Sequence, residues 1–416
     1  MKTLVRNATV IDPNGPYHKE VKDLVITDSK LEEIGTHLPS RPGYTEIVLE
    51  NLHVSPGWFD TSVSFGEPGY EERETLANGL DVAARSGFTA VAVQPNCFPV
   101  TDNQAQVRFL IEKAKNKATT LYPIGSLTQK SEGNDLAELY DMKNAGAIAF
   151  GDYGKSIANS NLLKIGLQYV QDFDGLVVCY SQDDQIKGQG VVHEGITAMQ
   201  LGLKGIPDLA EEIAVARNLA ILEYTGGKLH IPTLSSLKSV ALIREAKQKG
   251  LQVTCSVAVA QLVLNETQLN RFETHYKLNP PLRDEATRIG LLNAVLDNTI
   301  DCITSDHNPI DIEHKKVEFN LAKSGSIGLE SAFGALLTVL PLEVVVSKFL
   351  NGKTVFNLDN PVIAVNSPAN LTLFNPDTHW IFGTEAILSK SKNAAFVNRP
   401  MRGKVYGIIN NGQIII

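Results

Sequence analysis

The chain has 416 residues and a formal net charge of −8, with 43% hydrophobic and 20% charged residues. This length fits one large barrel with a smaller module, and the composition is ordinary for a globular protein that dissolves in water. The negative charge disfavours binding to nucleic acids and anionic membranes, and no apolar run reaches the length needed to cross a bilayer. The N-terminal residues show no secretory pattern, so we expect a cytoplasmic protein.

The two ends of the chain have the composition of a small β module. Short apolar segments separated by turn residues predict strands at 2–12, 22–35, 45–51, 369–382 and 403–416. The last segment contains an Asn-Gly pair, which is typical of a tight hairpin. We therefore expect residues 1–52 and 362–416 to join as one β-sandwich domain.

Between the two ends, apolar strand-like segments alternate with helical patterns. The strand candidates are 58–65, 89–96, 119–127, 147–154, 176–182, 228–235, 252–260 and 301–309. Eight β-α units of this length predict an α/β fold, a (β/α)8 TIM barrel over residues 53–361.

Two helices in this region have clear sequence signals. In 101–117, four apolar residues recur at helical spacing and predict one buried stripe, namely Val107, Leu110, Ile111 and Ala114. Thr101 or Asp102 is the expected N-cap of this helix. The helical pattern of 235–250 ends at Gly250, a residue suited to a helix C-terminus.

The four cysteines are Cys97, Cys179, Cys255 and Cys302, and no two form a CxxC pair. Each lies in or beside an apolar segment. We therefore expect buried free thiols in a reducing compartment.

Polar residues follow the expected barrel strands at their carboxyl ends, at Asn96, Asp152, Gln182 and Asp306. In a TIM barrel the functional site is built at this end of the strands. The sequence therefore predicts a site that combines residues from distant parts of the chain.

The motifs that carry these residues resemble those of dihydroorotases of the amidohydrolase superfamily, closest to forms that work with aspartate carbamoyltransferase. The resemblance runs nearly end to end, through VSPGWFDTSVSFGEPGYEERET, VQPNCFPVTDN, VVHEGITAMQLGLKGIPDLAEEIAVARNLAI, KLNPPLRDEATR, TSDHNP, GSIGLE and SKSKNAAF. It implies an amidohydrolase-type barrel, a flanking β-sandwich and the reversible ring closure of carbamoyl-aspartate in pyrimidine biosynthesis.

The resemblance also implies a zinc site, because the family activates water and polarises an amide carbonyl with zinc. Serine, tyrosine and threonine occupy the positions at which the family has its four histidine ligands, namely Ser62, Ser64, Tyr180 and Thr233. His230 matches a family histidine, but one that is not a ligand. Neutral hydroxyl groups are poor zinc ligands, so we expect no metal cofactor.

Two carboxylates remain at family positions, Asp152 and Asp306, while Tyr153 replaces a second aspartate. Asp306 matches the residue that binds metal and moves the proton in active relatives, and we expect it to be idle or structural here. A loosely held hard cation between the two carboxylates is the alternative.

The substrate positions are only partly kept. Asn96 and Asn279 match family asparagines that contact substrate, although both also fit a role in turns. Gly66 stands where the family has an arginine that grips the substrate carboxylate, and Ile310 stands where it has a histidine. We expect Asp60 to brace its strand end and His193 to serve packing or a dimer contact.

These losses favour a pseudoenzyme, a homo-oligomer that acts as a structural partner of aspartate carbamoyltransferase. Two alternatives remain: an active dihydroorotase or related cyclic amidohydrolase with an atypical zinc site, and a ligand sensor that uses the old pocket. Fold alone does not decide among them.

Overall fold

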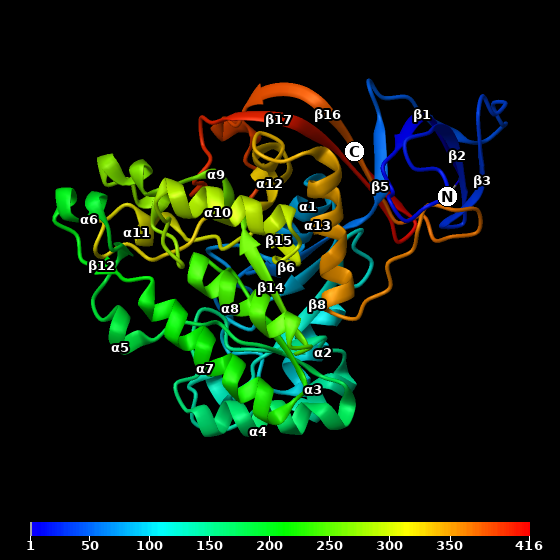
Figure 1. The fold of residues 1–416 in the computed structure, drawn as a ribbon. Coiled ribbons are helices and arrows are strands. Elements are labelled where there is room, and N and C mark those ends of the chain that lie inside the picture. Colours follow the sequence, from blue (N-terminus) through cyan, green and yellow to red (C-terminus); the bar gives the residue numbers. More distant parts are fainter. Residues whose placement is uncertain (1) are drawn as a thin grey trace.

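The computed structural model describes residues 2–416, and its centre is an eight-stranded parallel barrel (Figure 1). In order around the barrel the strands are β6 (Trp58–Val63), β7 (Phe88–Val93), β8 (Thr120–Gly125), β9 (Ala149–Phe150), β10 (Leu176–Val178), β13 (Lys228–Ile231), β14 (Val253–Ala258) and β15 (Cys302–Thr304). The first and last strands approach each other through a bridge between Val63 and His307. All eight expected strands are present, so the predicted barrel is confirmed.

Helices cover the outside of the barrel (Figure 1). The longer ones are α1 (Leu76–Arg85), α2 (Gln104–Lys113), α3 (Leu139–Ala145), α4 (Ser160–Val170), α7 (Leu209–Thr225), α8 (Leu237–Gln248), α10 (Glu285–Leu296), α12 (Leu329–Leu336) and α13 (Leu342–Val355). Helix α8 is followed by Gly250 at φ +83°, a conformation that suits glycine after a helix C-cap.

Helix α2 differs from the sequence expectation in two details. Its N-cap is Asn103, whose side chain accepts hydrogen bonds from two backbone N–H groups, and not Thr101 or Asp102. Thr101 is fully buried. Its N–H donates to the Pro95 carbonyl and its carbonyl accepts from the Ser126 N–H, so it belongs to the loop before the helix. Ile111 is 38% exposed and so does not belong to the buried stripe, which consists of Val107 and Leu110 with the half-buried Ala114 beside them.

The two ends of the chain join in an eight-stranded mixed sheet. Its strands are β1 (Lys2–Val10), β2 (Val21–Thr27), β3 (Lys30–Gly35), β4 (Thr45–Ile47), β5 (His53–Pro56), β16 (Leu371–Ile381), β17 (Pro400–Asn410) and β18 (Gln413–Ile415). The expected Asn-Gly hairpin lies between β17 and β18, with Asn411 and Gly412 both at positive φ. Strand β5, which the sequence placed at the start of the barrel, pairs with β1 and β16 in this sheet.

Shorter elements lie in the connections. They are β11 (Val192–His193), β12 (Gly205–Ile206), α5 (Asp184–Lys187), α6 (Ile196–Leu201), α9 (Val259–Val263) and α11 (Ile312–Lys315), with 3-10 turns at Gln129–Ser131, Gln171–Phe173, Glu266–Arg271, Thr274–Tyr276 and Thr384–Ala386. Within residues 2–416, no helix combines the length and apolarity that a membrane span would need.

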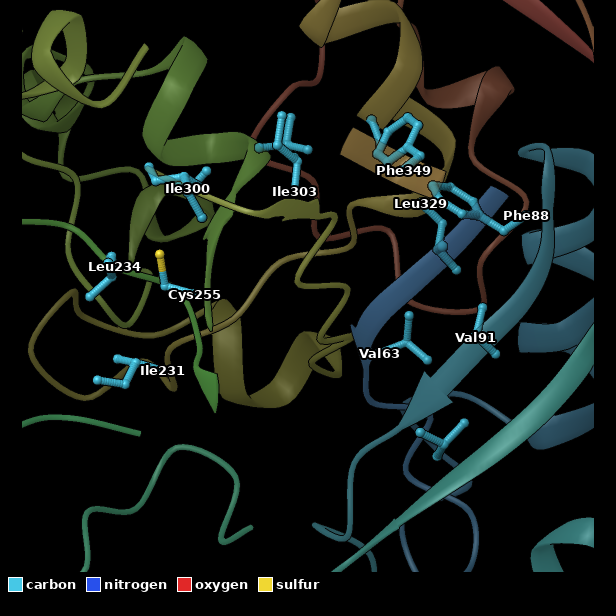
Figure 2. Close-up of a cluster of buried hydrophobic side chains, with 14 of the residues drawn as sticks. Val63, Phe88, Val91, Ile231, Leu234, Cys255, Ile300, Ile303, Leu329 and Phe349 are labelled. Atoms are coloured by element: carbon cyan, nitrogen blue, oxygen red, sulfur yellow. The ribbon is translucent and has the colours of Figure 1, made fainter. Parts of the chain in front are cut away.

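The main core lies in and around the barrel (Figure 2). One group of side chains lies near β14 and includes Ile231, Leu234 and Cys255, and another lies near β6 and β7 and includes Val63 and Val91. All four cysteines are buried free thiols, as the sequence predicted.

Trp58 anchors the barrel to the terminal sheet. Its ring is fully buried and lies 4.8 Å from the ring of Phe333 and 5.5 Å from that of Phe374, which belongs to β16. The indole N–H donates to the Ser55 hydroxyl at 2.8 Å, which satisfies its one polar group. This contact holds the sheet against one end of the barrel.

Candidate functional site

A cavity of about 300 Å³ opens at the carboxyl ends of the barrel strands. It is lined by Ser62, Gln94, Asn96, Gly151, Asp152, Tyr153, Gly154, Lys155, Val178, Tyr180, Pro232, Thr233, Asn279, Asp306, Asn308 and Ser324. Eight of the residues singled out by family position meet here, namely Ser62, Asn96, Asp152, Tyr153, Tyr180, Thr233, Asn279 and Asp306. A larger hollow of about 560 Å³ lies elsewhere, lined by residues such as Lys228, Asp301 and Phe356, and contains none of them.

Asp306 follows β15 and adopts φ +48°. Its carboxylate accepts hydrogen bonds from the Tyr153 hydroxyl at 3.2 Å and from the Ser62 hydroxyl at 3.5 Å. Burial raises the pKa of Asp306 to about 7, the Tyr153 hydrogen bond opposes that shift, and the nearby Asp60 carboxylate adds to it. Two neutral hydroxyl groups are therefore its immediate partners.

Asp152 is held by the loop that follows β8. Its carboxylate accepts from the Ser126 hydroxyl at 2.6 Å, from the Thr128 N–H at 3.1 Å and from the Thr128 hydroxyl. Three donors on one carboxylate use most of its acceptor capacity. Asp152 lines the cavity but serves chiefly to fix this loop.

The positions that correspond to the family histidines form no ligand cluster. Ser62 accepts from the Gln94 amide at 3.0 Å, and the Tyr180 hydroxyl donates to Gln182 at 3.2 Å. Thr233 is buried and adopts φ +50°, an unusual conformation for a β-branched residue. Ser64 is buried beside the site but does not line the cavity, so only one serine of the expected pair faces it.

His230 does not line the cavity. It is 1% exposed, and its two ring nitrogens contact the hydroxyls of Thr254 and Ser256 at 2.9 and 3.2 Å. Burial lowers the pKa of His230 to about 3, so the ring stays neutral. His230 thus contributes hydrogen bonds to the neighbouring strand β14.

The donor set does not fit a zinc ion. Zinc sites use three or four imidazole, thiolate or carboxylate ligands. Among residues 2–416, no group of three or more His, Cys, Asp and Glu side chains lies together in a way that could hold a metal ion. Of the two carboxylates in the cavity, that of Asp152 already accepts three hydrogen bonds from loop donors.

Gly66 and Ile310, the two positions at which the resemblance implies substrate-gripping residues, do not face the cavity. Gly66 adopts φ +92°, and a Cβ atom there would lie 2.6 Å from the carbonyl oxygen of Tyr70. Ile310 is 4% exposed, and neither residue lines the cavity. An arginine could therefore not be placed at position 66 without a change of backbone.

The cavity also contains residues that sequence reasoning missed. Asn308 lies two residues after Asp306, and Gln94 two residues before Asn96, so the alternation of side chains along the strand ends was an available signal. Lys155 and Ser324 reach the cavity from loops, and the sequence offered no signal for them.

Asp60 braces the strand end, as expected. It is fully buried and accepts from the Thr304 hydroxyl at 2.5 Å, from the Ser305 N–H at 3.0 Å and from the Ser62 N–H at 3.1 Å. Burial raises the pKa of Asp60, and these hydrogen bonds oppose the shift. The contacts fasten β6 to β15 beneath Asp306.

Arg283 is the centre of a buried polar network beside the barrel. Its guanidinium is 3% exposed and donates to the Ser235 hydroxyl at 3.0 Å, and it lies 3.1 Å from His193 Nδ1. It pairs with Asp208 at 2.6 Å and lies 4.0 Å from Glu211. His193 is thus buried within the chain. The network joins Asp208 and Glu211 of the GIPDLAEE motif to Arg283 of the PPLRDE motif.

Comparisons with known proteins agree with this architecture. The family described as dihydro-orotase-like matches residues 52–239. The chain is 36% identical to the dihydroorotase of Geotalea daltonii and 38% identical to that of Pelotomaculum thermopropionicum, and each alignment covers 100% of this chain and 99% of the relative.

Solved structures with the same fold include the L-hydantoinase (dihydropyrimidinase) from Arthrobacter aurescens, with a TM-score of 0.84, 20% identity and coverage of 100% of this chain and 98% of the other. The dihydropyrimidinase from Brevibacillus agri NCHU1002 also has a TM-score of 0.84, at 21% identity and with coverage of 100% and 95%. At this identity the likeness supports the fold alone.

Proposed function

Because this chain belongs to the dihydroorotase-like family, we propose that it is a member without metal-dependent hydrolysis that acts as a structural partner of aspartate carbamoyltransferase. One observation carries the proposal. The cavity at the strand ends has two carboxylates and no imidazole, and Asp152, one of the two, is saturated by Ser126 and Thr128.

The chemistry that is missing is substantial. Hydrolysis of a ring amide needs a strong nucleophile and a polarised carbonyl. A bound zinc ion would supply the first by lowering the pKa of its water to about 7, and the second by acting as a Lewis acid. The cavity offers no ligand set for such an ion. With Gly66 in place of the arginine, it also lacks a bidentate grip for a carboxylate substrate.

One observation favours the alternative, an atypical cyclic amidohydrolase. The pKa of Asp306 is raised to about 7 by burial, and a carboxylate with such a pKa is suited to act as a general base. However, the cavity contains no arginine or metal site to stabilise the negative charge of a tetrahedral intermediate. We therefore rank this alternative second.

The partnership rests on what the chain has kept. The Arg283 network joins segments far apart in the sequence, through His193, Glu211 and Ser235. A fold that keeps this buried network while its catalytic positions are replaced is consistent with selection for assembly with a partner rather than for catalysis. The enzyme that precedes dihydroorotase chemistry in pyrimidine synthesis is the partner that the family resemblance implies, and binding would stabilise it by mass action.

The test has two parts. Elemental analysis after dialysis should give no stoichiometric zinc, and dihydroorotate should not be hydrolysed above background. About one zinc per chain together with turnover that disappears in Asp306→Ala would refute the loss of catalysis.

The second part concerns the partner. Co-expression with the aspartate carbamoyltransferase of the same cell should give one complex in size-exclusion chromatography with light scattering, containing more than one copy of each chain. Two separate peaks at micromolar concentration, with unchanged transcarbamoylase activity, would contradict the structural role.

A further inference from the structure

Most of the side chains that line the cavity at the strand ends carry an uncharged hydrogen-bonding group. Amides come from Gln94, Asn96, Asn279 and Asn308, and hydroxyls from Thr233 and Tyr180. A volume of about 300 Å³ lies at the small end of the range for ligand sites. The strand ends therefore surround an open cavity with polar side chains rather than a filled core.

Several of these groups have no partner within the protein. Across residues 2–416, the side-chain amides of Asn96 and Asn308 and the hydroxyl of Thr233 make no hydrogen bond to another residue, although all three side chains line the cavity. Polar groups that converge on a concave site without protein partners are available to a ligand. Filling the space with an apolar molecule would leave these groups without hydrogen-bond partners, which disfavours such a ligand.

The charges around the cavity disfavour an anion. Asp306 presents a carboxyl group to the cavity, with the buried carboxyl of Asp60 behind it. The cation in the lining is Lys155, whose exposed ammonium group donates to the Ser131 carbonyl at 3.0 Å. Gly66 provides no cation, so a ligand carboxylate would meet acidic groups with little compensation.

From these observations we propose that the cavity binds a small uncharged molecule with several amide-type hydrogen-bond donors and acceptors, and that it discriminates against the same molecule when a carboxylate is attached. This inference rests on the proposed function, since an intact catalytic site would consume such a ligand. It assigns the former active site to binding without turnover.

A matched pair of probes tests the proposal directly. Dihydrouracil and dihydroorotate share one ring and differ by a single carboxylate group. Isothermal titration of the full-length protein at pH 7.5 should show binding of dihydrouracil, with dihydroorotate at least tenfold weaker. Equal or tighter binding of dihydroorotate, or no binding of either probe, would overturn the proposal.

Variants locate the binding and separate the two hypotheses. Asn96→Ala and Asn308→Ala should each weaken dihydrouracil binding at least fivefold, whereas Asn161→Ala on the exposed surface of α4 should not. Unchanged affinity in both cavity variants, with circular dichroism like the parent, would place the binding elsewhere and refute the site. Chromatography of the recovered ligand should show intact dihydrouracil; hydrolysed product would refute the proposed function, while a failure to bind would leave that function standing.

Discussion

Replacement of Arg283 by methionine should strongly destabilise the barrel. The guanidinium is 3% exposed and contacts Ser235, His193 and Asp208, and it also bonds the backbone carbonyl of Ile206 at 3.2 Å. Methionine keeps much of the volume but removes the charge and all the donors. The carboxylate of Glu211, which is 7% exposed, would then lose its nearest cation.

The magnitude follows from how much of Glu211 stays satisfied. Removing one partner of a buried ion pair typically costs about 3–5 kcal/mol. Glu211 would keep hydrogen bonds from the Ser235 N–H, the Ser235 hydroxyl and the Ser236 N–H, at 3.0, 2.5 and 3.0 Å. We therefore expect a loss near the lower limit, about 3 kcal/mol in the free energy of unfolding.

The assay is urea unfolding followed by tryptophan fluorescence, since Trp58 is buried at the end of the barrel that meets the sheet. The control is Arg244→Met. Arg244 also pairs with an aspartate, Asp297, at 2.7 Å, but the two side chains are 45% and 47% exposed. An exposed pair contributes about 0–1 kcal/mol. Losses for the two variants that agree within 1 kcal/mol would refute the idea that the Arg283 network organises the fold.

Three further expectations concern other parts of the chain. Gly66→Arg should lower the unfolding midpoint more than Gly133→Arg, because a Cβ at position 66 meets the Tyr70 carbonyl whereas the space at 133 is open; equal midpoints would contradict this. His230 has its pKa lowered to about 3 by burial, so between pH 6.5 and 3 the unfolded chain binds the extra proton and stability falls as the pH falls, by up to about 1.4 kcal/mol per pH unit. Urea unfolding at pH 4.5 and 7 should show that His230→Gln loses less stability on acidification than the parent protein does. An identical loss in the two proteins would contradict the role of His230. Lys315, whose pKa burial lowers to about 7, should make stability rise between pH 7 and 10 because the unfolded lysine stays protonated there; the rise should shrink in Lys315→Met.

The barrel could be predicted from the sequence because buried parallel strands are continuous apolar runs with polar residues at their carboxyl ends. The site was predictable where a residue lies on such a strand end, as with Ser62 and Asp306. It was not predictable where loops decide the contacts. The saturation of Asp152 by Ser126 and Thr128 depends on a loop conformation that no local pattern specifies.

The same limit explains the smaller errors. Thr101, Asp102 and Asn103 are all residue types that cap helices. The sequence does not show that Thr101 is buried by tertiary contacts or that the helix begins after Asn103. The expected serine pair failed for Ser64 because the strand ends at Val63, and the Ser64 N–H is bound to the carbonyl of His307. Contacts of this kind join segments far apart in the chain and leave no local signal.

The mixed terminal sheet has a consequence for synthesis on the ribosome. Strand β5 pairs with β16 through residues such as Pro56 and Leu371. One edge of β5 therefore stays unpaired until about 300 further residues are synthesised, which takes roughly 15–60 s at typical translation rates. During that interval the edge of β5 that later pairs with β16 stays open while the barrel segments are synthesised. An unpaired edge can pair with other chains, so we expect the nascent protein to be most prone to aggregation before its last fifty residues emerge.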